Sequence, residues 1–345
     1  MRSLREKIDL QRYSIYIILF LMIVASSFLS PNFLTEANLV NIPRQLAVTT
    51  ILAFGAMMLI VCGMIDLSAG SVLALAGVLS VVTFKATGSM WLAVAVALLI
   101  GVACNIINAV MVANFNTPPF IATLAMAMVA RGAVLLYTKG QNILQLGDYT
   151  KLGQGSLGPI PIPVLFLVGV TAIVWYLMTQ TKYGRALYAI GGNEAAARAS
   201  GINVIRTKYQ AYILNGLLVG LAGVLFMSRV NAGLPNGAVG YEMEGLTSAI
   251  VGGTSFTGGI GTTMGTLAGS FIIGLLNNIM NLTGVDSYVQ QITKGAIIAI
   301  AVIYDIASKK GKKTRVILKE GPPHQTSSSV DGSPPTGASV SPVKG

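Results

Sequence analysis

Residues 181–204 read TKYGRALYAIGGNEAAARASGINV and lie between two apolar stretches, at 162–179 and 209–230. Each stretch is close to the roughly 20 apolar residues that a helix needs to cross a bilayer. A plain connector between helices needs only about 2–8 residues. The sequence therefore predicts two membrane helices joined by a loop that has structure of its own.

A short helix is expected inside this loop. The core from Glu194 to Ala199 is rich in alanine, which has the highest helix propensity. Asn193 is a suitable N-cap, and Glu194 stands in the first turn, where the helix dipole favours an acid. Gly201 is expected to end the helix. Because alanine leaves a shallow contact face, two interpretations stay open: a helix that docks on a partner, or a solvated surface helix.

The rest of the chain indicates an all-α integral membrane protein, a polytopic bundle of about ten transmembrane helices. Helices suit a membrane because every backbone amide must be satisfied within the segment. Two stretches are weak, since 245–258 is short and 67–84 directly follows its predecessor. The alternative is eight crossings, with these two as re-entrant segments. The predicted spans are 14–30, 46–64, 67–84, 90–112, 118–137, 162–179, 209–230, 245–258, 261–280 and 290–307.

The composition excludes several classes of protein. Of the 345 residues, 53% are hydrophobic and 10% are charged, against roughly 25% charged in soluble domains. Cys62 and Cys104 lie in apolar stretches, and the single histidine, His324, lies in a polar tail. We therefore expect no metal site, no disulfide framework and no histidine-based catalysis. The excess of bases lies outside the apolar stretches, which argues against binding of nucleic acid and for loops at the lipid surface.

The distribution of bases predicts the orientation, since cytoplasmic loops carry an excess of Lys and Arg. Sixteen of the 23 bases fall in three segments that share one side in a ten-span or eight-span topology. We expect a cytoplasmic N-terminus (1–13), a membrane domain (14–307) with a cytoplasmic loop (180–208), and a disordered cytoplasmic tail (308–345) that is basic and then rich in Ser, Pro and Gly. The bases are Arg2, Arg5, Lys7, Arg12, Lys182, Arg185, Arg198, Arg206, Lys208, Lys309, Lys310, Lys312, Lys313, Arg315, Lys319 and Lys344.

The loop also resembles a known segment. The string from Gly191 to Val204 is similar to the coupling segment in permease subunits of bacterial ABC importers, in the monosaccharide branch that carries ribose, galactose or xylose. The importer signature of the maltose type fits poorly, because Gly201 comes one residue late and no I-x-L-P follows. The resemblance implies an ABC importer permease fold. The residues it assigns to coupling with the ATPase are Gly191, Gly192, Asn193, Glu194, Ala196, Ala197, Ser200 and Gly201.

Two further strings support the same family. GMIDLSAGS at 63–71 resembles its G-x-D-L-S-x-G-S string, and YEMEGLTSAIVGGTSFTGGIG at 241–261 resembles a glycine-rich string later in the chain. This second string departs from the family, since Glu244 stands where aspartate is usual and Gly245 replaces alanine.

Glycines in and after this second string have two expected roles. The first set recurs every four residues and predicts a seam of close helix packing. The second set predicts unwound backbone beside a water-filled path. The seam comprises Gly261, Gly265 and Gly269, and the unwound set comprises Gly252, Gly253, Gly258 and Gly259.

Polar residues within apolar stretches are candidates for the translocation path: Asp66, Ser68, Asn105, Asn277 and Asn278. Carboxylates inside a membrane are usually functional, and neutral amides can bind sugar hydroxyls. The alternatives are structural, because Asp66 or Ser68 can cap the following helix. The amides can also join helices, at roughly 0.6 kcal/mol each.

Other charged residues near the apolar stretches have less certain partners. Lys294 is expected either to reach the interface or to pair with Asp66 or Asp305. Glu242 and Glu244 are candidate contacts for a partner on the outer face.

Missing motifs define the expected partners. No G-x-x-x-x-G-K-[ST] string occurs, so ATP and Mg²⁺ would bind to a separate ATPase subunit, with no cofactor in this chain. The longest outward loop, 138–161, is too short for a sugar-binding domain, which implies a separate binding protein. The resemblance implies a non-enzymatic monosaccharide importer subunit of the bacterial cytoplasmic membrane that works as a pair with a second permease chain. The alternatives are an ion-coupled secondary transporter, or an ABC permease for nucleosides or branched-chain amino acids.

Overall fold

The computed structural model describes residues 2–313. By contacts the chain forms two units, Met1–Ala307 and Ser308–Gly345, and the first carries the features discussed below. The predicted disordered tail lies mostly outside the described residues.

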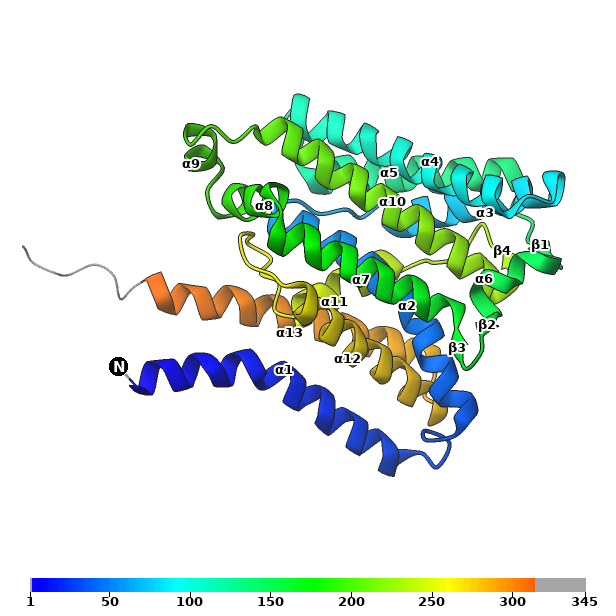
Figure 1. The fold of residues 1–345 in the computed structure, drawn as a ribbon, viewed down its shortest axis with the longest axis horizontal. Coiled ribbons are helices and arrows are strands. Elements are labelled where there is room, and N and C mark those ends of the chain that lie inside the picture. Colours follow the sequence, from blue (N-terminus) through cyan, green and yellow to red (C-terminus); the bar gives the residue numbers. More distant parts are fainter. Residues whose placement is uncertain (1, 314–345) are drawn as a thin grey trace, which may run out of the picture. The chain divides into compact units, whose positions relative to one another are not determined.

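Helices make up most of the described chain (Figure 1). The short strands pair antiparallel, β1 with β4 and β2 with β3. In Figure 1 they lie at the end of the bundle opposite to α8 and α9. The elements are α1 (Arg2–Leu29), α2 (Glu36–Val61), α3 (Ala69–Thr87), α4 (Met90–Ala109), the π-helix η1 (Val110–Asn114), α5 (Pro119–Thr138), β1 (Ile143–Leu144), the 3-10 helix η2 (Gly147–Thr150), α6 (Lys151–Gln154), β2 (Ser156–Leu157), β3 (Ile160–Pro161), α7 (Ile162–Gln180), α8 (Lys182–Gly192), α9 (Glu194–Ala199), α10 (Val204–Val230), β4 (Ala232–Gly233), α11 (Tyr241–Val251), α12 (Thr263–Leu282) and α13 (Ser287–Lys313).

Within the described residues, eight helices are long and apolar enough to cross a membrane. The polytopic helical class is therefore confirmed, but neither predicted set of spans is reproduced. The alternative prediction that 67–84 is a re-entrant segment is wrong, because α3 is a full 19-residue helix. The stretch 245–258 does not form a spanning helix, since α11 has 11 residues and unwinds at a glycine pair. The apolar stretch Ile15–Leu29 belongs to α1 and is additional to these eight helices.

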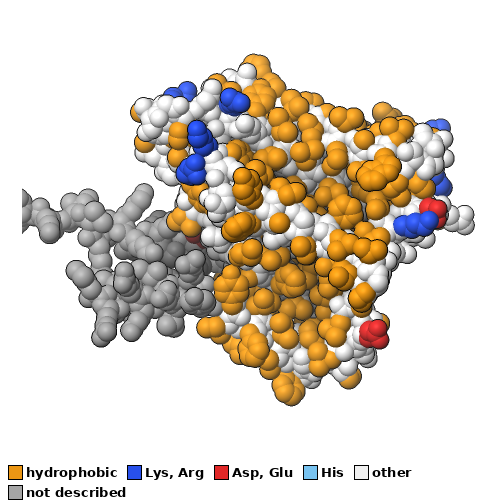
Figure 2. All heavy atoms as spheres, viewed as in Figure 1, with side chains coloured by type: hydrophobic (Ala, Val, Ile, Leu, Met, Phe, Trp, Pro, Cys, Tyr) orange, Lys and Arg blue, Asp and Glu red, His pale blue; other side chains and the backbone are white. Residues whose placement is uncertain are grey.

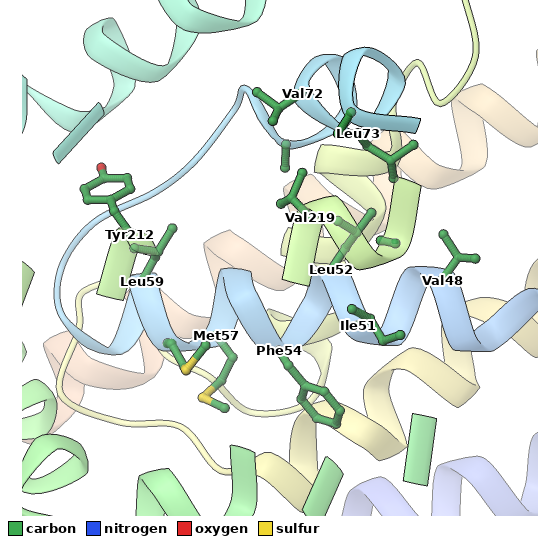
Figure 3. Close-up of a cluster of buried hydrophobic side chains, with 14 of the residues drawn as sticks. Val48, Ile51, Leu52, Phe54, Met57, Leu59, Val72, Leu73, Tyr212 and Val219 are labelled. Carbon is green, nitrogen blue, oxygen red and sulfur yellow. The ribbon is translucent and has the colours of Figure 1, made fainter. Parts of the chain in front are cut away.

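The core lies around α2 and α10, whose side chains are mostly buried. Figure 3 shows Leu59 of α2 beside Tyr212 of α10, and Leu52 of α2 beside Val219 of α10. In α4, α5 and α7, by contrast, only 28% of the apolar window is buried. Figure 2 shows hydrophobic side chains over the visible face, with charged side chains gathered towards its two ends. Such a surface suits a helical bundle surrounded by lipid.

Two seams let helices approach closely. On α10, a Cβ at Gly216 would lie 2.8 Å from the carbonyl carbon of Gly101 in α4. On α12, a Cβ at Gly269 would lie 2.6 Å from the backbone nitrogen of Gly252, at the end of α11. The predicted packing role of Gly265 and Gly269 is thus confirmed, and their seam holds α12 against the short α11. Gly261 was predicted in the same seam, but it lies in the loop before α12, where its Cβ would meet Val61 and Thr254 instead.

Candidate coupling segment and polar sites

The predicted helix in the 181–204 loop is present as α9, preceded by α8. Asn193 caps α9, since its Oδ1 accepts the Ala196 N–H at 3.0 Å. Gly201 has φ +82°, a left-handed conformation that glycine adopts without a Cβ penalty. Both local predictions are confirmed. The structure leaves open both interpretations of the helix, a helix that docks on a partner and a solvated surface helix.

Ion pairs hold α9 against the start of α10. Glu194 lies 3.1 Å from Arg198 in its own helix and 2.9 Å from Lys208 in α10. The hydrogen bond from Lys208 lowers the pKa of Glu194, and Arg198 adds to the effect. Ala197 is buried against the bundle, whereas Ala196 is exposed. The outer face of α9 is therefore a shallow surface of alanines on a helix fixed to α10.

The end of α8 contacts two other elements through backbone atoms. A Cβ at Gly191 would collide with Val61 O at the end of α2 and would lie 2.7 Å from Gly259 N. Gly259 N–H in turn donates to Val61 O at 2.9 Å, and Tyr188 of α8 donates its hydroxyl to Gly261 O at 2.7 Å. We call this contact of Gly191, Val61 and Gly259 the glycine joint. It connects α8 directly to α2 and to the loop that follows α11.

That loop, residues 252–262, is the unwound backbone that its glycines predicted. Gly253, Gly258 and Gly259 have φ values of +86°, +84° and +73°. On its other side, Asp305 of α13 accepts hydrogen bonds from Ser255 Oγ at 3.0 Å and Phe256 N at 3.1 Å. The loop therefore makes hydrogen bonds to all three helices, α8, α2 and α13.

Three of the path candidates form one buried network. Asp66 accepts the Ser68 N–H at 2.7 Å and the Ser68 hydroxyl through one oxygen. Its other oxygen accepts Asn215 Nδ2 at 2.6 Å. Asn215 Nδ2 also lies 2.9 Å from Asn105 Oδ1. These side chains are at most 4% exposed, so the network fixes the segment before α3 to α4 and α10.

Sequence reasoning missed Asn215, the member that joins Asp66 to Asn105. The signal was present, because Asn215 is a polar amide within the apolar stretch 209–230. Its partners are 149 and 110 residues away in the chain, however. The contacts favour a bracing role for Asp66, since its oxygens already accept three hydrogen bonds; a role in the path stays a prediction.

The other two candidates lie elsewhere. Asn278 exchanges hydrogen bonds with Asn38 of α2, at 2.8 and 3.2 Å, which joins two helices as the structural alternative proposed. Asn277 donates to Glu244 Oε1 at 3.4 Å. Neither residue is hydrogen-bonded to the Asp66 network, so the five predicted path residues form no single site.

Glu244 belongs to a second polar site. Lys294 Nζ lies 2.6 Å from Glu244 Oε1, so the predicted pairing of Lys294 with Asp66 or Asp305 is wrong. A cleft of about 480 Å³ opens beside this ion pair, between α11, α12 and α13. Its polar lining includes Thr247 and Gln291. In the part of the chain that the structure describes, no group of three or more His, Cys, Asp or Glu could hold a metal ion.

Comparisons with known proteins agree with this architecture. A family model described as "Branched-chain amino acid transport system / permease component" matches residues 38–302. The ribose import permease protein RbsC of Escherichia coli K12 is 41% identical over 294 residues, which cover 84% of this chain and 92% of the relative. That of Bacillus subtilis 168 is 40% identical over 299 residues, or 86% and 93%.

A relative that is named for a different sugar also matches. The L-arabinose transport system permease protein AraH of E. coli K12 is 33% identical over 304 residues, or 88% of this chain and 93% of the relative. No solved structure matches the chain significantly. The predicted resemblance is confirmed, and the chain belongs to this family of multi-pass transport permeases, within its branch of sugar ABC importer permeases.

Proposed function

We propose that this chain is the membrane permease of an ABC importer for a monosaccharide of the ribose, galactose or xylose kind. The identity of about 40% with ribose import permeases over most of the chain carries this proposal. The matched region contains the whole 181–204 loop. The chain would be a transport subunit of the bacterial cytoplasmic membrane, with both termini cytoplasmic, and no enzyme.

The partners follow from the same proposal. Two ATPase subunits, which bind ATP and Mg²⁺, would grip the loop formed by α8 and α9. A separate sugar-binding protein would deliver the substrate on the opposite face, and a second permease chain would complete the channel. The coupling residues are those predicted from Gly191 to Gly201, and the exposed alanine face of α9 supports the contact.

The glycine joint suggests how movement would spread from the ATPase. A shift of α8 and α9 would press on Val61 and Gly259 through backbone atoms, which cannot yield by changing rotamer. The joint would pass the shift to the end of α2 and to the loop after α11. Rocking of these helices would open a cavity alternately to each side.

Reconstitution in liposomes tests the proposal. The purified chain is inserted with its ATPase and binding protein, and uptake of labelled ribose, galactose, xylose and leucine is measured. We expect ATP-dependent uptake of a monosaccharide that requires both partners. Leucine uptake would support the branched-chain amino acid alternative that the family description suggests. Sugar accumulation by the chain alone, driven by an ion gradient, would show a secondary transporter.

A further inference from the structure

The cleft between α11, α12 and α13 contains an ion pair between Lys294 and Glu244. Lys294 stands seven residues after Ser287, at the start of α13, which corresponds to about 10 Å along a helix. Its ammonium group points at Glu244, on the neighbouring helix α11, instead of towards the end of α13. The side chains are 32% and 14% exposed. The pair is therefore partly open to the cleft.

The ion pair indicates that the cleft opens to water or to a polar solute, and not to lipid. Charged side chains within a membrane are costly, and they almost always face a bundle interior or a water-filled cavity. Lys294 has three donors, of which Glu244 takes one. The remaining donors are best satisfied by water or by a polar solute. The cleft is thus expected to open to water at membrane depth.

The walls of the cleft combine two kinds of chemistry. Ile273, Leu276 and Ile298 supply apolar surface, while Gln291 and the ion pair supply hydrogen-bonding groups. The volume of about 480 Å³ falls in the range of roughly 300–1,000 Å³ that is usual for small-ligand sites. A sugar ring has apolar C–H faces and a rim of hydroxyl groups, so both kinds of wall can engage it.

We infer that this cleft is a monosaccharide-binding subsite of the translocation path. The inference rests on the proposed sugar import and adds the place in the chain where the sugar is held. The short helix α11 forms one wall and continues into the 252–262 loop, which belongs to the glycine joint. Movement at α8 therefore reaches the wall that carries Glu244.

Protection from labelling tests the subsite. Gln291→Cys is made in a chain in which Cys62 and Cys104 are replaced, and the complete transporter is treated with a charged, membrane-impermeant thiol reagent. We expect labelling that millimolar ribose slows at least severalfold and that leucine leaves unchanged. The matched control is Ile292→Cys, the exposed neighbour that does not line the cleft. Ribose should not protect it. Equal labelling of both positions, or no protection by ribose, would overturn the inference.

A kinetic experiment covers the case in which the cysteine variants fail to fold. Gln291→Ala in the native chain should raise the KM for ribose uptake roughly threefold to tenfold, the effect of one lost hydrogen bond. An unchanged KM in a transporter that imports ribose would refute the subsite alone. Absence of ATP-dependent uptake of ribose, galactose and xylose by the unmodified transporter would instead refute the proposed function.

Discussion

Replacing Gly191 with alanine places a methyl group at the glycine joint, between α8, the end of α2 and the 252–262 loop. The new Cβ would collide with Val61 O and lie 2.7 Å from Gly259 N and 2.9 Å from the Val61 carbonyl carbon. Heavy atoms in good contact are about 3.5–4.0 Å apart. The segments would therefore have to separate by at least roughly 0.5 Å, and overpacking of this kind costs about 1–3 kcal/mol.

Gly192 provides a matched control in the next position. A Cβ there would meet nothing within 4 Å. Gly192→Ala therefore adds the same methyl group as Gly191→Ala but does not fill the glycine joint. The stability of Gly192→Ala should stay within about 0.5 kcal/mol of the unmodified chain.

Thermal unfolding in detergent measures the stability, and the reconstituted transporter measures ribose uptake and ATP hydrolysis side by side. We expect Gly191→Ala to unfold at a lower temperature and to lose more uptake than ATP hydrolysis, because the ATPase still docks on α9 while the shift no longer reaches α11. The reasoning would be refuted if Gly191→Ala were as stable as Gly192→Ala and lost no more uptake than ATP hydrolysis relative to the unmodified chain.

Three further changes test other contacts. Asn215→Leu should lower stability by about 1.5–3 kcal/mol, because it removes a hydrogen bond to the buried carboxylate of Asp66; a smaller loss than for an exposed asparagine would argue against the network. Glu194 has a pKa below its ordinary 4.5 in the folded chain, so its contribution to stability is present above pH 4.5 and lost as pH falls through the lowered pKa. As the pH falls across that range, the unfolding temperature should therefore drop less for Glu194→Gln than for the unmodified chain. Equal pH profiles of the two unfolding temperatures would contradict the ion pair with Lys208. Gly269→Ala should destabilise the chain by about 1–3 kcal/mol through contact with Ser248 O and Gly252 N, whereas Gly295→Ala, with nothing within 4 Å, should not; thermal shifts of equal size would count against the seam.

Features with a local backbone cause could be predicted from the sequence. The Asn193 cap, the left-handed Gly201 and the unwound glycines after α11 each reflect a demand that a single residue meets. The glycine seam on α12 was equally visible, because a four-residue repeat places small residues on one face of a helix.

Features that depend on distant packing could not be predicted. The bonds of Asn215 to Asp66 and Asn105 join residues more than 100 positions apart. Likewise, the partner of Lys294 depends on how α11 packs beside α13, and hydropathy alone does not give that arrangement. The glycine joint combines backbone atoms of three segments, each of which looks like an ordinary turn or helix end in the sequence.

One measurement tests most directly whether the ATPase drives this chain through α9. Ala196 is exposed, so Ala196→Trp adds bulk to the outer face of α9 without filling the core. Ala103→Trp, at an exposed position on α4, is the control. In the reconstituted transporter we expect Ala196→Trp to abolish ATP-driven ribose uptake while membrane insertion and thermal stability are retained, and Ala103→Trp to import at the normal rate. Normal uptake and normal stimulation of ATP hydrolysis with Ala196→Trp would contradict the assignment.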